Sequence, residues 1–90
     1  MKVYLLQIHR DGELDDGSVY DELFHFDNLG DLEAEFRNKM NYYTAHSLDL
    51  LVWKIPELDE DTNEVYGCFE FRNKAGDRVM ARASDLDIGD

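Results

Sequence analysis

Residues 11–22, DGELDDGSVYDE, combine the residue types and the spacing of a calcium-binding loop. A loop of the EF-hand type needs oxygen ligands at positions 1, 3 and 5, a glycine at position 6 and a glutamate at position 12. Carboxylates occupy positions 1, 3, 5 and 12 here, but Asp16 stands at position 6 and Gly17 comes one place late. We therefore predict no specific calcium site in this stretch.

A second near-match to a calcium loop begins at Asp59. Oxygen-bearing side chains follow at Asp61, Asn63 and Glu70, but Glu64 occupies the position where the sharp turn needs glycine. EF-hand loops join helices, whereas both acidic stretches are expected to join strands. In a chain this rich in acids, such matches arise by chance, so no calcium site is predicted here either.

Four side chains could ligate zinc: His9, His25, His46 and Cys68. None of them has the close spacing of zinc ligands, such as two cysteines or two histidines separated by two to four residues. His9 and His25 are expected at opposite ends of a hairpin, and His46 follows a helix. We predict no metal ion and no cofactor.

Cys68 is the one thiol available for nucleophilic catalysis. A reactive thiolate needs a cation, a helix N-terminus or a general base beside it, and Arg72 is the nearest cation along the same expected strand. Paired carboxylates are uninformative in so acidic a chain, and a domain of this size has little volume for a deep pocket. The sequence favours a protein that is not an enzyme.

The charge of the chain is its most distinctive property. It has 21 Asp and Glu against nine Lys and Arg, giving a net charge of −12 and a pI of about 4.4. Phosphate backbones and anionic membrane surfaces repel such a protein, so we expect no direct nucleic-acid or membrane binding. A basic protein surface is the partner that it would meet fastest. The alternative is that the charge serves only solubility.

The aromatic residues pair along the chain as Phe24 with Phe26, Tyr42 with Tyr43 and Phe69 with Phe71, with a single Trp53. Base-stacking platforms need cationic surroundings, which this chain lacks, so these rings are expected in the core. Trp53 or Tyr42 could instead be an exposed anchor for a protein partner.

The chain has one cysteine and therefore no internal disulfide. Its first apolar run is too short for a signal peptide and ends at Arg10, and no segment approaches a membrane span. The expected compartment is the cytoplasm.

Two strands are predicted before any helix. Residues 2–9 form a nearly continuous apolar run, which indicates a central strand buried on both faces. Residues 18–26 alternate, with Glu22, Phe24 and Phe26 on one face, which predicts a second, antiparallel strand.

The period then changes to that of a helix over residues 29–44. Leu29, Leu32, Phe36, Met40 and Tyr43 recur at spacings of three and four and define one apolar face. The helix is expected to start at an Asp or Asn cap just before this segment and to carry two Glu-to-Lys/Arg pairs at i,i+4.

Three further strands are expected at residues 48–55, 65–73 and 78–83. Pro56 should end the first of them, and a tight turn at residues 73–77, with Gly76 free to adopt a left-handed backbone, should join the last two. Residues from about 85 to 90 are expected to fray as an acidic tail.

The predicted order is ββαβββ in a single compact domain of residues 1–90. The fold class is α+β, with two layers: a mostly antiparallel sheet of about five strands and one amphipathic helix packed on one of its faces.

Two short connecting segments, residues 11–22 and 57–64, hold eleven of the 21 acids. Acids at i and i+2 in an extended segment would form a row, about 6.5–7 Å apart, that a groove built for phosphates could accept. The candidate partner-binding residues are Asp11, Glu13, Asp15, Asp16, Asp21, Glu22, Asp59, Glu60, Asp61 and Glu64.

No catalytic or family motif is recognised. In size and charge the chain resembles small acidic α+β proteins such as phage-encoded inhibitors of host defence, nucleic-acid mimics and immunity proteins. The resemblance implies an inhibitor that masks the nucleic-acid-binding surface of a restriction or CRISPR effector. The alternatives are an immunity protein or antitoxin for a nuclease toxin, and a structural or assembly accessory protein whose charge serves only solubility.

Overall fold

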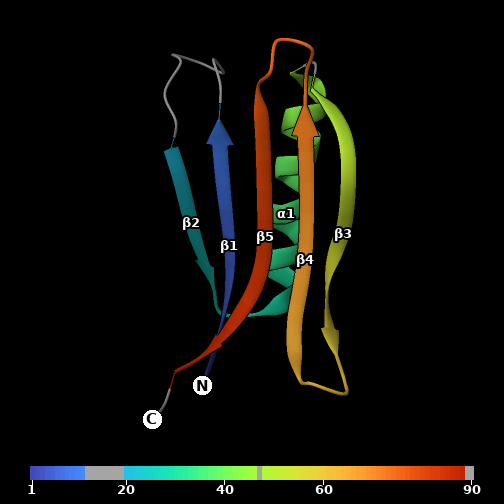
Figure 1. Cartoon of the computed structure of the whole chain (residues 1–90). Helices are drawn as coiled ribbons and strands as arrows, with labels where there is room; N and C mark the ends of the chain where they lie inside the picture. The colour runs from blue at the N-terminus through green and yellow to red at the C-terminus, as the bar shows by residue number, and fades with distance from the viewer. Residues whose placement is uncertain (12–19, 47, 89–90) are drawn as a thin grey trace.

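The computed structural model describes residues 1–11, 20–46 and 48–88. It contains five strands in one sheet, in the order β2-β1-β5-β4-β3, and every neighbouring pair is antiparallel. The single helix lies behind the sheet in Figure 1, and the opposite face has no covering layer among the described residues. The predicted two-layer α+β fold, with the order ββαβββ, is confirmed.

The first hairpin joins β1 (Lys2–Asp11) to β2 (Tyr20–Phe26). The helix-facing side chains of β1, Leu6 and Ile8, are fully buried, whereas Gln7 between them is exposed. The prediction that this strand is buried on both faces is therefore wrong. β1 is an interior strand, but only one of its faces is covered, because the described residues contain one helix.

The helix α1 (Leu29–Ala45) begins and ends close to the predicted residues. Asn28 is its N-cap, and its side-chain Oδ1 accepts a hydrogen bond of 2.8 Å from the backbone N–H of Asp31. Leu32, Phe36 and Tyr43 are buried against the sheet, so the predicted apolar face is confirmed. The two i,i+4 pairs also form, Glu33 with Arg37 and Glu35 with Lys39.

The edge strand β3 (Asp49–Asp59) continues past Pro56, which was predicted to end it. Proline removes a backbone donor, and sheets accept it only at edges and bulges. Both conditions hold here, because β3 has one neighbour and its register with β4 shifts between Lys54 and Glu57. Gly67 of β4 makes room, because a Cβ there would lie 2.8 Å from three Pro56 atoms.

The last hairpin joins β4 (Glu64–Arg72) to β5 (Arg78–Asp87) through the predicted turn. Asn73 accepts hydrogen bonds from the backbone of Ala75 and Asp77 with its side chain, and Gly76 has a φ of 95°. The predicted fraying of the tail is wrong up to Asp87, which pairs with Lys2 of β1. The segment pairs with the interior strand β1, so it forms a strand in spite of its acidic composition.

The core lies between α1 and the sheet. Tyr43 and Phe36 of the helix contact Phe69 and Phe71 of β4, and the Phe36 and Phe69 rings meet edge to face at 5.1 Å between centroids. The other buried apolar side chains are Leu6, Ile8, Leu32, Leu48, Val65, Val79, Ala81 and Ala83.

Candidate functional site

The described acids of the two segments lie at opposite ends of the molecule. The turn that joins β3 to β4 is at the bottom of Figure 1, and the end of β1 and the start of β2 are at the top. The longest dimension of the structure is 45 Å. Glu13, Asp15 and Asp16 fall outside the described residues. The structure therefore does not bring the ten predicted acids together, and one partner would have to span the molecule to contact both ends.

The bottom end is a turn crowded with exposed carboxylates, those of Asp59, Glu60, Asp61 and Glu64. None of the four forms an ion pair with any described residue. Asp59 Oδ1 accepts a hydrogen bond of 2.9 Å from the backbone N–H of Asp61, and Asn63 has a φ of 59°. The predicted extended row of Asp59 and Asp61 is therefore a turn instead, in which the carboxylates face solvent.

The acids at the other end have partners within the chain. Asp21 on β2 contacts His9 Nδ1 at 2.6 Å, and Asp11 Oδ2 lies 4.0 Å from Arg78. Glu22 points to the helix side and accepts a hydrogen bond of 2.8 Å from the buried Arg10. Arg10 and Arg78 partly neutralise Glu22 and Asp11, and Asp21 has a hydrogen-bond partner in His9, so these three carboxylates are less available to a partner than those of the bottom turn.

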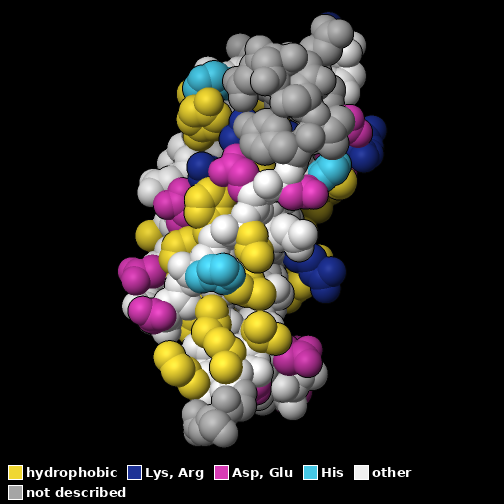
Figure 2. Space-filling view, turned by 90° about the vertical axis from the view of Figure 1, so that its left-hand side faces the viewer, with side chains coloured by type: hydrophobic (Ala, Val, Ile, Leu, Met, Phe, Trp, Pro, Cys, Tyr) yellow, Lys and Arg dark blue, Asp and Glu magenta, His cyan; other side chains and the backbone are white. Residues whose placement is uncertain are grey.

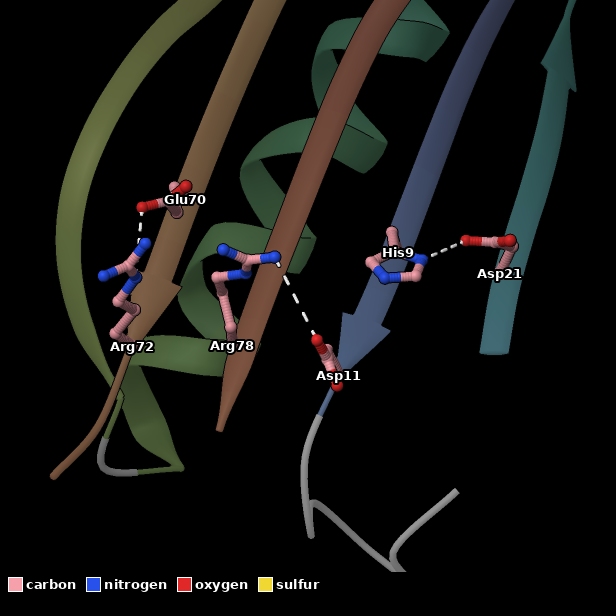
Figure 3. A network of polar contacts seen from close by, with 6 residues as sticks. All are labelled: His9, Asp11, Asp21, Glu70, Arg72 and Arg78. Atoms are coloured by element: carbon pink, nitrogen blue, oxygen red, sulfur yellow. Dashed lines mark hydrogen bonds and ion pairs between the residues drawn. The ribbon is translucent and has the colours of Figure 1, made fainter. Parts of the chain in front are cut away.

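The uncovered face of the sheet carries a polar network near the end of β1. Figure 3 shows its six side chains in front of the strands, with α1 behind. The pairs are His9 with Asp21, Arg78 with Asp11, and Arg72 Nε with Glu70 at 3.4 Å. The sequence prediction missed this network because it depends on which face the helix covers.

A shallow pocket of about 390 Å³ opens on the same face, below this network. Its floor is largely apolar, from Val52, Phe69, Met80 and Ala81. Its polar lining residues are Gln7, His9, Tyr66, Cys68, Glu70 and Arg82.

Tyr66 and Cys68 are hydrogen-bonded neighbours in this pocket. That hydrogen bond, together with an electrostatic interaction with Cys68 and a small effect of burial, raises the pKa of Tyr66 above its usual value of 10.0, although nearby Arg82 opposes the shift. At neutral pH the phenol is a hydrogen-bond donor, as for any tyrosine with a pKa of 10 or higher.

Two cations flank Cys68 in the sheet, Arg82 on β5 and Lys54 on β3, each directly opposite in the register. The sequence analysis considered only Arg72. Arg82 could have been found from the predicted turn at residues 73–77. A turn that pairs Arg72 with Arg78 fixes the register of β4 with β5, and this register also pairs Cys68 with Arg82. His9 also lines the pocket, but it lies on β1, which β5 separates from β4, and no described hydrogen bond links it to the thiol.

The histidines do not converge. In the register of the first hairpin, His9 lies opposite Asp21 and His25 lies opposite Leu5, four residues before His9 on β1. His46 is the C-cap of α1. Within residues 1–11, 20–46 and 48–88, no group of three or more His, Cys, Asp or Glu side chains is arranged to hold a metal ion.

Several large apolar side chains are exposed. Trp53 on the edge strand β3 is 58% exposed and Tyr42 is 44% exposed, whereas Tyr43, Phe69 and Phe71 are in the core as predicted. Figure 2 looks onto the β2 edge and shows hydrophobic side chains gathered over its lower half. The exposed apolar residues of β2 and β5, Leu23 and Leu86, add to the surface available for contacts.

Comparison of the chain with protein-family models, with curated proteins and with solved structures gives no match. In the part of the chain that the structure describes, no helix is long and apolar enough to cross a membrane.

Proposed function

We propose that this protein is a non-enzymatic acidic binding protein that covers a basic, nucleic-acid-binding surface of a target protein. The observation that supports this most directly is the turn at residues 59–64. It presents four exposed carboxylates at one tip of the molecule, and they have no ion-pair partners among the described residues. A phage-encoded inhibitor of a CRISPR or restriction effector is the most concrete form of this function.

The physical basis is the competition between carboxylates and phosphates for the same cations. A groove that binds nucleic acid displays Lys and Arg, and these form charge-assisted hydrogen bonds with carboxylates as they do with phosphates. The free acids of the 59–64 turn lie close enough to repel one another, and a cationic partner relieves that repulsion. The net charge of −12 adds long-range attraction that raises the association rate.

The proposal places the protein in the cytoplasm, where nucleases of this kind act on nucleic acid and where its single thiol, Cys68, would stay reduced. A second candidate function is an accessory protein that docks through apolar side chains. The exposure of Trp53 on the edge strand favours it, because exposed Trp is enriched at the centres of protein interfaces.

The test begins with affinity capture of partners from the lysate of the source cell, at low and at high salt, with identification by mass spectrometry. The captured partner is then measured by surface binding kinetics and by competition with labelled nucleic acid. The test variant is Asp59→Asn, Glu60→Gln and Asp61→Gln combined. Asn at position 59 keeps the acceptor for the Asp61 N–H, so the turn is retained.

The matched control variant removes the same number of charges from dispersed positions, with Asp27→Asn, Glu33→Gln and Asp49→Asn. Wild type and control should displace nucleic acid and bind with a steep salt dependence, while the test variant should associate more slowly with a flatter salt slope. Equal losses in both variants would mean that only net charge matters. Unchanged rates in the test variant, or capture that survives high salt, would refute the proposal and favour apolar docking.

A further inference from the structure

The pocket on the uncovered face of the sheet has a charge pattern opposite to that of the whole protein. Apart from the phenol of Tyr66 and the thiol of Cys68, its ionisable lining residues are His9, Glu70 and Arg82. His9 is held by Asp21, and Glu70 by Arg72. Arg82 is exposed and forms no ion pair with any residue in the described ranges. The pocket of this very acidic chain therefore presents one uncompensated cation.

The surroundings of Arg82 are mostly apolar. Met80, two residues away on the same strand, and Val52 on β3 line the pocket beside it, and the ring of Tyr66 borders it. Arg82 and Tyr66 also line the next hollow, toward Glu64 and Asp85, yet Arg82 forms an ion pair with neither. Asp85 is already paired with Lys2 at 2.9 Å.

We propose that this pocket binds a small organic monoanion, with a carboxylate on Arg82 and an apolar or aromatic body over Met80 and Val52. The volume of about 390 Å³ lies in the range of small-molecule sites. Arginine is suited to the carboxylate, because its planar guanidinium donates two parallel hydrogen bonds to it.

Two neighbours extend the recognition of the anion. Tyr66 lines the pocket, and its phenol hydroxyl can donate a hydrogen bond to a second oxygen in exchange for its bond to Cys68. Gln7 lies directly opposite Arg82 in the register and brings an amide donor to the same row.

The net charge of −12 does not prevent an anion from binding here. The nearest acid of the 59–64 turn along β4, Glu64, lies four residues from the row of Cys68 and Arg82, about 13 Å of backbone at strand rise, and Asp59 and Glu64 border the next hollow, which Arg82 also lines. Salt screens charges beyond about 8 Å at physiological ionic strength, whereas a direct contact with Arg82 is screened much less. This inference does not rest on the proposed function, which concerns the acidic turn.

The three methionines provide a direct assay. Met80 lines the pocket, Met40 lies on α1 and Met1 is at the N-terminus, so protein labelled at the methionine methyl groups gives one reporter and two internal controls. The probes are phenylacetate and its neutral isostere phenylacetamide, titrated and followed by NMR. We expect phenylacetate to shift the Met80 signal saturably and to bind about three- to tenfold more tightly than the amide.

Arg82→Gln is the test variant and Arg78→Gln is its matched control. Both arginines lie on β5 and on the uncovered face, but Arg78 faces Asp11 outside the pocket. Arg82→Gln should abolish the preference for the acid over the amide, and Arg78→Gln should keep it. Unchanged Met40 and Met1 signals would show that each variant is folded.

Three results would overturn the proposal. One is the absence of a saturable Met80 shift with phenylacetate, and another is equal affinity for the acid and the amide. The third is an acid preference that survives in Arg82→Gln, which would mean that another group binds the carboxylate.

Discussion

Replacing Gly67 with alanine tests the contact that lets proline sit inside a strand. Gly67 is buried on β4, facing the bulge of β3 at Pro56. A Cβ built on Gly67 would lie 2.8 Å from the N, Cα and Cγ atoms of Pro56. That is about 0.6 Å short of the 3.4 Å at which ordinary van der Waals contact begins. Two of the three atoms are backbone, so no rotamer change relieves the clash.

The expected cost combines two opposing effects. Forcing an extra methyl group into a packed site costs about 1–3 kcal/mol, because strands must move apart or strain. Alanine also lowers the conformational entropy of the unfolded chain, which stabilises the folded state by about 0.4–1 kcal/mol where the native backbone accepts alanine. The net prediction is a loss of about 1–2 kcal/mol, or a fall in Tm of roughly 4–16 °C for a domain of this size.

Chemical denaturation followed by tryptophan fluorescence measures this loss, since Trp53 lies on the same strand as Pro56. Gly30→Ala is the matched control: its Cβ would meet only the Asn28 Oδ1 that caps the helix, at 3.3 Å rather than 2.8 Å, and alanine favours the helix. The control should be neutral or slightly stabilising. If Gly67→Ala is as stable as wild type, the close approach of the two strands at the bulge is wrong.

Three further outcomes follow from the same structure. Phe36→Ala should lower the free energy of unfolding by about 3–5 kcal/mol, because the side chain is fully buried against Phe69; a loss below about 1 kcal/mol would contradict the assigned helix face. Calorimetric titration should find no calcium dissociation constant below about 10 μM, the weak end of the sensor range. The hydrogen bond to Asp85 raises the pKa of Lys2 above 10.5, so its stabilisation is present below that pH and lost as the pH rises through the raised pKa. Thermal melts should therefore show a steeper loss of stability above about pH 10.5 in wild type than in Asp85→Asn.

Local sequence patterns were sufficient for the helix and the last hairpin. Leu32, Phe36 and Tyr43 recur with the helical period, and Asn28 precedes them as a cap. Gly76 has the positive φ that the turn requires. These features depend on residues that are close in the sequence, so they can be predicted without knowledge of the tertiary structure.

Two of the errors, at Pro56 and in the C-terminal tail, concern contacts between different strands. Pro56 ends a strand unless a glycine on the neighbouring strand makes room, and Gly67 is eleven residues away. The tail pairs with β1 because Lys2 and Asp87 meet in the register, a contact across nearly the whole chain. From local composition alone, Pro56 is expected to break a strand and the acidic C-terminal segment is expected to fray. Pairing with a neighbouring strand keeps both in the sheet.

The candidate site was predictable only in part, for the same reason. A polar loop at residues 57–64 was predicted from its composition; β3 continues to Asp59, and the acids of the remaining 59–64 turn are exposed. The internal partners of Asp11 and Asp21 depend on the register of β1 with β2 and β5. The pocket around Arg82 depends on the pairing of four strands and on the absence of a second helix among the described elements.

The two proposed binding surfaces are the 59–64 turn and the pocket around Arg82. They are close enough for binding at one to change the affinity of the other, and electrostatics fixes the direction of that change. An anion bound at Arg82 adds negative charge near the 59–64 turn, so it strengthens the binding of a basic partner there, and linkage makes the effect reciprocal. At a separation of roughly 10–13 Å in water the interaction is about 0.3–0.4 kcal/mol, and salt reduces it to about a third of that. The coupling changes either affinity by less than about twofold, well below the three- to tenfold preference expected at Arg82. If the test of one surface fails, the proposal for the other surface is unaffected, because the two tests substitute different residues.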